Sequence, residues 1–434
     1  GFTHTDFIRT PQPRHEKRVR TLVDRLVERD EIYLGEYEGW YDEGQEEFVS
    51  ESVARDNDYV GAISGKPLVR YAEPSYFFRL SKWVPRLIEH IEATPRFVLP
   101  EARRNEVLSK LRMGVEDLSI SRPLEKLGGW GVPMPNNPTH SVYVWIDALS
   151  NYMTALGIPE AGLDDDGRHA GYWPADVHLI GKDILWFHAV YWPCMLMALD
   201  MPLPRLVFAH GWWTAEGRKM SKSLGNFVSR EKIAGYCREY SVDVFRYYLL
   251  RAVAFGGDGD FSAEGLRTRY NTELANGIGN LLSRTVKMIS KYFEGTVPAA
   301  DADVPESADV RNAAADLCAA GDDLMAACGF HAYLEKVLGL TAATNRFIDV
   351  TEPFKLASDP TARGRLATIL NTCAEAVRII LLHLRPFMPT TADRGLSQLG
   401  GPASGLSHAE APRWGELPAG AKVRTGEPLF PRKA

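Results

Sequence analysis

Lys219 and Lys222, three residues apart, are the residues of this 434-residue chain whose types and spacing most clearly indicate chemistry. They lie in the segment 211–226, GWWTAEGRKMSKSLGN, whose Gly/Ser-rich second half, 217–226, has few apolar residues to anchor it to a core. Ammonium groups on flexible stems suit a polyphosphate whose charge changes during a reaction, because point charges need no fixed bidentate geometry. An isolated lysine pair is more often part of a solvated surface loop. The segment therefore indicates either a mobile phosphate-binding loop or plain surface.

Three strand-like segments lie upstream of these lysines. The segment 141–148, SVYVWIDA, is β-branched and aromatic and is predicted to be a buried strand. Segments 177–181 and 205–209 are the other two, and Asp183 opens a predicted helix between them. Strand, helix, strand and loop in this order are typical of a parallel α/β sheet, in which ligands bind beyond the carboxyl ends of the strands. The lysines therefore fall on the side where we expect a nucleotide.

Residue composition and apolar periodicity change twice along the rest of the chain. An amphipathic helix with an apolar stripe from Val19 to Val27 precedes residues 32–138. Short aromatic pieces and Gly/Pro punctuation at the start of this range predict an inserted subdomain of short strands and loops, and helical patterns follow at 80–93 and 100–113. After Phe227 helical periodicity continues almost to the end, interrupted by an acidic, Ala/Pro-rich linker near 297–308. We therefore predict an α/β domain followed by an all-α domain.

Composition excludes several classes of protein. Hydrophobic residues make up 45% and charged residues 24%, as in a globular protein. The net charge of -6 argues against a surface that is basic overall, but a local basic face can still bind nucleic acid. The five cysteines include no C-x-x-C pair, which suits reduced thiols in a cytosolic protein and gives no zinc-ligand spacing. The longest apolar run, 189–199, is roughly half the ~20 residues of a membrane span. With no signal peptide visible, we expect a cytoplasmic protein without a membrane segment.

Several short motifs, taken together, resemble the methionyl-tRNA synthetase family of class I aminoacyl-tRNA synthetases. They extend from Phe7 to Pro431 and read FIRT, YLGEYEGWY, SYFFRLS, LSISRP, YVWIDAL, GKDI, HGWW, KMSKS and DxFRYYLLR. Each motif alone is weak, whereas the combination is specific. The resemblance implies an α/β fold with a Rossmann-type parallel-sheet catalytic domain and a connective insertion, followed by an all-α helical-bundle anticodon-binding domain.

The resemblance also implies a division of the chain. The family's HIGH motif is absent here and by resemblance belongs upstream of Gly1, so we expect residues 1–31 to be a remnant of the first half of the catalytic domain. The further expected parts are the connective insertion (32–138), the second half of the catalytic domain with the KMSKS loop (139–226), a stem-contact linker (227–262) and the anticodon-binding domain (263–434).

The activity that the resemblance implies is that of a methionine-tRNA ligase. Such an enzyme makes methionyl-adenylate from methionine and ATP with Mg²⁺, then transfers the methionyl group to the 3' end of tRNA(Met). The implied residues are Lys219 and Lys222 for catalysis; Gly181, Asp183, His210, Gly211 and Lys222 for ATP; Trp145, Tyr152, Ile184 and His188 for methionine; and Asn280, Arg284 and Phe354 for the anticodon. We expect a monomer.

The residue types at the implied methionine site fit a thioether. Aromatic rings attract polarizable sulfur, and a neutral His188 can offer an N–H to it. Without the resemblance, Trp145 in a buried strand and His188 on an apolar helix face would be core residues. Asp183 suits ribose hydroxyls but equally suits a helix N-cap.

The implied anticodon residues also have a plainer interpretation. Asn280 and Arg284 are four residues apart on one predicted helix, where an amide and a guanidinium can read the edges of splayed bases, although a solvated helix face is the alternative. Phe354 stands where the family commonly has a stacking Trp, and a phenyl ring still stacks on a base. Arg122, in SISRP, lies near the active site by resemblance or is an exposed loop arginine.

The chain departs from the family's zinc-bearing members, and two alternative functions stand beside that of a methionine-tRNA ligase. The family's zinc-bearing members have knuckle cysteines where this chain has Asp42 and Gln45, so we expect no structural zinc. Because HIGH is absent, a truncated or inactive relative that acts only as a tRNA-binding module is the alternative function. A synthetase for another amino acid is disfavoured, because the set Trp145, Tyr152 and His188 is present and no large editing insertion is.

Overall fold

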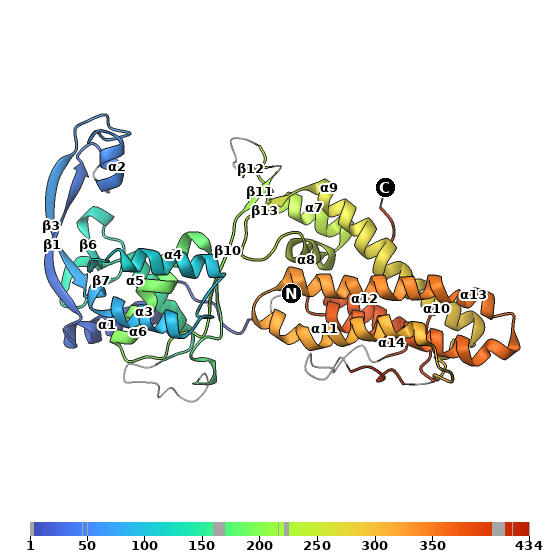
Figure 1. Cartoon of the computed structure of the whole chain (residues 1–434). Helices are drawn as coiled ribbons and strands as arrows, with labels where there is room; N and C mark the ends of the chain where they lie inside the picture. The colour runs from blue at the N-terminus through green and yellow to red at the C-terminus, as the bar shows by residue number, and fades with distance from the viewer. Residues whose placement is uncertain are drawn as a thin grey trace. The chain divides into compact units, whose positions relative to one another are not determined.

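The computed structural model divides the chain into two compact units, Gly1–Ala209 and His210–Ala434 (Figure 1). The structure describes residues 4–45, 47–49, 51–158, 170–215, 217–220, 225–401, 413–418 and 420–433. Each unit has its own hydrophobic core. The finer five-part division stays a prediction.

A small parallel sheet lies in the core of the first unit. Its strands are β4 (Val98–Leu99), β10 (Val207–His210) and β9 (His178–Gly181), in the order β4-β10-β9, and β10 runs parallel to β4. The strand predictions at 177–181 and 205–209 are therefore confirmed. Among the helical segments of this unit are α3 (Leu80–Ala93), α4 (Glu101–Arg112), η2 (Ala170–Tyr172), η3 (Lys182–Ile184), η4 (Phe187–Tyr191) and α6 (Trp192–Ala198). The fold is the expected Rossmann-type α/β arrangement.

The predicted strand at 141–148 is wrong beyond Val142. Strand β8 (Asn137–Val142) pairs antiparallel with β6 (Ser121–Pro123) and β7 (Pro133–Met134), and helix α5 (Val144–Ala155) begins two residues later. β-Branched residues favour a strand only where the packing of the folded protein allows it. Here the polar side chains of the following residues fall on one face of a helix. Trp145 therefore lies on a helix.

The first helix, α1 (Pro13–Glu28), buries the stripe that its periodicity predicts. His15, Val19, Leu22, Val23 and Leu26 are its buried residues, and the helix packs against α5. His15 is the one polar member of this stripe.

The insertion is a long antiparallel ribbon, seen in blue in Figure 1. Strand β1 (Ile32–Asp42) pairs with β3 (Val69–Phe78) from Ile32 to Tyr41, and β2 (Glu47–Val49) and β5 (Leu118–Ser119) complete a sheet of order β2-β1-β3-β5. The short helices α2 (Glu51–Asp56) and η1 (Glu125–Leu127) flank it. Alternation along β1 confirms the prediction of strands in this region.

The second unit is mainly helical, as predicted for residues after Phe227. A three-stranded sheet of order β12-β11-β13 precedes and joins its helices, with β11 (Trp213–Ala215), β12 (Arg218–Lys219) and β13 (Gly259–Phe261). The helices are α7 (Arg230–Tyr240), α8 (Val242–Arg251), α9 (Ala263–Arg269), the π-helix η5 (Tyr270–Gly279), α10 (Asn280–Tyr292), η6 (Pro305–Ser307), α11 (Ala308–Ala326), α12 (Phe330–Thr351), α13 (Pro353–Leu356), η7 (Pro360–Ala362), α14 (Arg363–Leu384) and α15 (Pro389–Gln398).

Helix α14 forms the centre of this second core. In the described part of the chain, the stretch Pro360–Leu384 is long and apolar enough to cross a membrane, and its apolar part is 94% buried inside the structure. Such burial is typical of the core helix of a helical bundle.

Candidate functional site

Helix α5 presents two aromatic residues, Trp145 and Tyr152, on one face. Seven residues separate them, which is two turns of an α-helix, so their side chains point in nearly the same direction. Trp145 stacks on Phe187, with ring centroids 3.8 Å apart and planes 10° from parallel. His188 lies edge-on to both Trp145 and Tyr152. We call Trp145, Tyr152, Phe187 and His188 the aromatic cluster.

A hydrogen bond joins the two polar members of the aromatic cluster. The Tyr152 hydroxyl lies 3.0 Å from His188 Nε2, and His188 Nδ1 lies 3.0 Å from the Ile184 carbonyl. Because a carbonyl only accepts, Nδ1 carries the hydrogen, and in the neutral ring Nε2 then accepts from Tyr152. Burial lowers the pKa of His188 and raises the pKa of Tyr152, which favours this neutral pair.

The structure brings together three of the residues that we expected to bind methionine, and it changes the expected role of His188. His188 lies edge-on to Trp145 and is hydrogen-bonded to Tyr152, and Ile184 supplies the carbonyl that orients His188. The N–H that we expected His188 to offer to sulfur is donated to Ile184 instead. The π-helix η4 holds His188, and π-turns often occur at functional positions.

Sequence reasoning missed His178, which lies on β9 beside this group. Its ring centroid is 4.4 Å from that of Tyr152 and 5.9 Å from that of His188. Burial, with a smaller contribution from His188, lowers the pKa of His178 to about 4. Its Nε2 atom is buried and has no hydrogen-bond partner among the residues that the structure describes. The sequence signal that could have identified His178 is a histidine in the predicted strand that leads to Gly181, one of the expected ATP-binding residues.

The expected ribose residues follow the carboxyl end of β9. Gly181 is the N-cap residue of η3, and Asp183 is an exposed residue inside this short helix. The N-cap interpretation of Asp183 is therefore wrong, because Gly181 occupies that position. The end of a parallel strand is where ligands of α/β sheets bind.

His210 is the last residue of β10, and Gly211 follows it. His210 Nδ1 lies 2.9 Å from the Gly211 carbonyl and donates to it. A Cβ atom at residue 211 would lie 2.2 Å from the Gly257 carbonyl oxygen, so the close approach of the two backbones requires glycine. This approach fixes the start of the segment that carries the lysines.

Strands β11 and β12 form a hairpin that carries Lys219, which we call the lysine hairpin. Two aspartates of the second unit hold it, and sequence reasoning missed both. Asp258 Oδ1 accepts from the Trp212 N–H at 2.8 Å, and Asp260 Oδ1 accepts from the Gly217 N–H at 2.8 Å. Lys219 ends β12 with an exposed side chain. Lys222 lies outside the described residues.

The expected anticodon residues all lie in the second unit. Arg284 on α10 pairs with Asp349 on α12, with Nη2 and Oδ1 3.0 Å apart, and both side chains are partly exposed. Asn280 is exposed one turn earlier on α10, and the Phe354 residue on α13 is 52% exposed. The pair of Arg284 with Asp349 therefore links α10 to the end of α12, five residues before Phe354.

Arg122 is not an exposed loop arginine. It lies half-buried on β6, where Nη1 donates to the Ser119 hydroxyl at 2.6 Å, and its guanidinium lies over the rings of Tyr37 and Tyr143. Tyr143 is the N-cap residue of α5. Arg122 is thus fixed beside the start of the helix that carries Trp145.

A carboxylate closes the ribbon tip where the family's zinc-bearing members have cysteines. Asp42, only 2% exposed, accepts from the Ser64 hydroxyl at 2.7 Å and from the Gly44 N–H at 2.9 Å. The hydrogen bond from Ser64 is the main reason why the pKa of Asp42 lies below its ordinary value. Gln45 is exposed. Within the described ranges, no group of three or more His, Cys, Asp or Glu side chains is placed to hold a metal ion.

The family model described as "tRNA synthetases class I (M)" matches residues 1–57 and 57–286. A methionine-tRNA ligase of Halalkalibacterium halodurans is 43% identical over 442 residues, which cover 99% of this chain and 66% of that relative. A methionine-tRNA ligase of Caldanaerobacter subterraneus subsp. tengcongensis is 44% identical over 431 residues, again 99% of this chain and 66% of that relative. The chain thus spans just under two thirds of the length of these curated relatives.

Solved structures give the same likeness over almost all of the chain. The methionyl-tRNA synthetase of Mycobacterium tuberculosis in complex with methionyl-adenylate is 37% identical, with a TM-score of 0.85 and coverage of 99% of this chain and 83% of that one. Its apo form is 36% identical with a TM-score of 0.85 and covers 100% of this chain and 84% of that one.

Proposed function

The chain belongs to the tRNA synthetases of class I (M), and we propose that it acts as a methionine-tRNA ligase. The observation that carries this proposal is the neutral hydrogen bond between Tyr152 and His188 beside the stacked Trp145. An uncharged, polarizable group of rings suits an uncharged thioether and disfavours a charged side chain, whose desolvation would be costly. The similar structure that holds methionyl-adenylate supports the same assignment.

In the proposed reaction the methionine carboxylate attacks the α-phosphate of ATP, and pyrophosphate leaves. The methionyl group then passes from the adenylate to the terminal adenosine of tRNA(Met), releasing AMP. Such a transfer requires alignment of reactants and stabilisation of developing negative charge rather than a covalent enzyme intermediate. We assign the charge stabilisation to Lys219 and Lys222, and Mg²⁺ enters bound to ATP.

The remaining roles follow the positions of the expected residues. Gly181 and Asp183 at the end of β9, with His210 and Gly211 at the end of β10, bind the adenosine part of ATP. Asn280, Arg284 and Phe354 contact the anticodon of tRNA(Met). We further propose that the protein is a cytoplasmic monomer.

Methionine-dependent ATP–pyrophosphate exchange tests the proposal. The purified chain, free of host synthetase, is assayed with methionine and, as matched controls, with leucine and glutamine. Exchange that requires methionine is the expected result. Binding of tRNA(Met) without exchange for any amino acid would instead favour a tRNA-binding module, and exchange driven by leucine would overturn the assignment of the aromatic cluster.

A further inference from the structure

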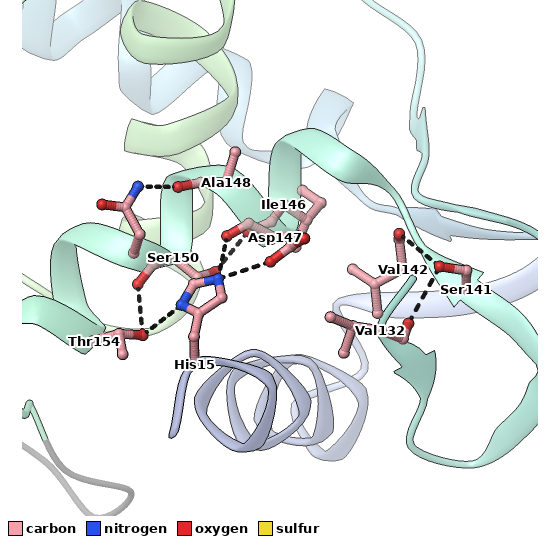
Figure 2. A network of polar contacts seen from close by, with 10 residues as sticks. His15, Val132, Ser141, Val142, Ile146, Asp147, Ala148, Ser150 and Thr154 are labelled. Atoms are coloured by element: carbon pink, nitrogen blue, oxygen red, sulfur yellow. Dashed lines mark hydrogen bonds and ion pairs between the residues drawn. The ribbon is translucent and has the colours of Figure 1, made fainter. Parts of the chain in front are cut away.

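His15 is a completely buried histidine of α1 that bonds to two separate turns of α5. Its Nε2 lies 2.7 Å from the Asp147 carboxylate and 3.1 Å from the Asp147 carbonyl, and its Nδ1 lies 2.9 Å from the Thr154 hydroxyl (Figure 2). Both atoms that Nε2 meets on Asp147 accept hydrogen bonds, so Nε2–H is the donor. One side chain therefore spans α5 from its first turn to its last.

A second residue of α1 holds the end of the same helix. Arg18, one turn after His15, donates through Nη2 to the Gly157 carbonyl at 3.2 Å and through Nη1 to the Ile158 carbonyl. These carbonyls lie just beyond Leu156, the C-cap of α5, at the end of the helix where positive charge is favourable. His15 and Arg18 together form a polar clamp along α5.

The polar clamp and the aromatic cluster occupy opposite faces of α5. Successive residues of an α-helix are about 100° apart, so Asp147 lies about 200° from Trp145, and Thr154 lies about 200° from Tyr152. Any rotation or sliding of α5 against α1 therefore moves both rings together. The hydrogen bond from Tyr152 to His188 depends on the position of α5, because His188 comes from a different element.

We propose that His15 is a positioning residue for the aromatic cluster, acting through α5, and the proposal rests on the methionine-binding role given to that cluster above. Apolar packing is non-directional and tolerates small shifts of a helix, whereas hydrogen bonds weaken steeply with distance and angle. Contacts at two turns fix both the rotation and the axial position of α5. The hydroxyl of Tyr152 is thereby held within bonding distance of His188 Nε2.

Four substitutions separate this role from general stability. His15→Ala removes both contacts, whereas His15→Gln keeps an amide N–H near the position of Nε2 and so keeps the contact with Asp147. Val19→Ala is the matched control, because Val19 is a fully buried residue of the same stripe of α1, one turn further on, and makes no polar contact with α5. Thr154→Val removes the other arm of the contact while leaving Asp147 in place.

The first measurement needs no ligand. In protein with ¹³C-labelled histidine rings, the His188 signal, assigned by its loss in His188→Gln, reports the hydrogen bond with Tyr152. We expect His15→Ala to shift this signal, His15→Gln and Thr154→Val to shift it less, and Val19→Ala to leave it in place. A His188 signal that stays at the parental position in His15→Ala, or that moves equally in Val19→Ala, overturns the proposal.

The second measurement is calorimetric titration with methionine and, separately, with ATP. His15→Ala is expected to raise the Kd for methionine about tenfold, the equivalent of one lost hydrogen bond, and to leave the Kd for ATP within about twofold. Equal weakening of both ligands overturns positioning in favour of a structural role. If the parent chain binds no methionine, the proposed function fails, while the His188 signal still decides whether His15 positions the aromatic cluster.

Discussion

The Tyr152 hydroxyl lies 3.0 Å from His188 Nε2, and burial shifts the pKa values of both residues toward their uncharged forms. The two residues come from α5 and from the π-helix η4, so this bond ties together two elements that are adjacent only in the folded chain. A neutral pair with both nitrogens of His188 engaged leaves an apolar environment with no charge to attract a polar substrate side chain. Under the proposed function, selectivity for a thioether then comes from ring faces and shape.

Tyr152→Phe should weaken methionine binding about tenfold. The change leaves His188 Nε2 buried without its donor, which costs about 1–3 kcal/mol, and it frees the His188 ring to turn. Calorimetric titration with methionine checks this, with Tyr33→Phe as the control, because Tyr33 donates to Asp117 in the insertion of the same unit. An unchanged Kd in Tyr152→Phe would show that the bond does not shape the site.

The stability of the protein should fall between pH 7 and pH 5 because of His178. Its pKa is about 4 in the folded protein and 6.5 in the unfolded chain, so the unfolded chain takes up a proton first as the pH falls. The folded state is therefore stabilised above about pH 6.5 and loses that advantage toward pH 4, by about 2 kcal/mol between pH 7 and pH 5. Urea unfolding at both pH values checks this, and His178→Gln should show a smaller loss. Equal losses in parent and variant would assign the effect to other groups.

Lys222→Ala should slow methionine-dependent pyrophosphate exchange by roughly 10²-fold with little change in the Kd for methionine. A charge that acts on the transition-state phosphates affects the chemical step more than ground-state binding. Lys232→Ala, an exposed lysine of α7, is the control for loss of positive charge at the surface. A change of less than threefold in Lys222→Ala contradicts the assigned role.

The ribbon tip should contain no zinc and should depend on Asp42 instead. Elemental analysis of protein purified without chelator is expected to find far less than one equivalent of zinc. Asp42→Ala removes the acceptor for the Ser64 hydroxyl and the Gly44 N–H and should make the tip a preferred site of limited proteolysis. Zinc near one equivalent, or a tip in Asp42→Ala that resists protease as well as the tip of the parent protein does, would contradict this prediction.

The sequence predicts most of the helices and the parallel strands, because the apolar periodicity that buries them is local. It fails for α5, because the residues that decide its structure are far away: His15 meets Thr154 across 139 residues and Asp147 across 132. A β-branched segment read by itself favours a strand. Its polar residues become explicable only when the buried histidine of α1 is placed against them.

The candidate site shows the same limit. Trp145, Tyr152 and His188 could be grouped from their motifs, whereas the partner of each nitrogen of His188 depends on the wide turn of η4, which no local pattern indicates. The aspartates that hold the lysine hairpin bond to it across more than 40 residues, Asp258 to Trp212 across 46 and Asp260 to Gly217 across 43. Motifs therefore identify reactive side chains more readily than the groups that orient them.

Arg284 pairs with Asp349, and this pairing makes a sharp test of anticodon recognition. Arg284→Ala should weaken binding of tRNA(Met) by about 1–3 kcal/mol, by analogy with other guanidinium contacts to base edges, and leave ATP and methionine binding unchanged. Asp349→Ala should not weaken binding, because it frees the same guanidinium and removes a negative charge from an RNA-facing surface. Gel-shift titrations at fixed salt, with tRNA(Met) and with a tRNA(Met) of altered anticodon, measure both variants. The Arg284→Ala loss should be confined to the native anticodon, whereas an equal loss for the two tRNAs would mean that Arg284 contributes only nonspecific charge.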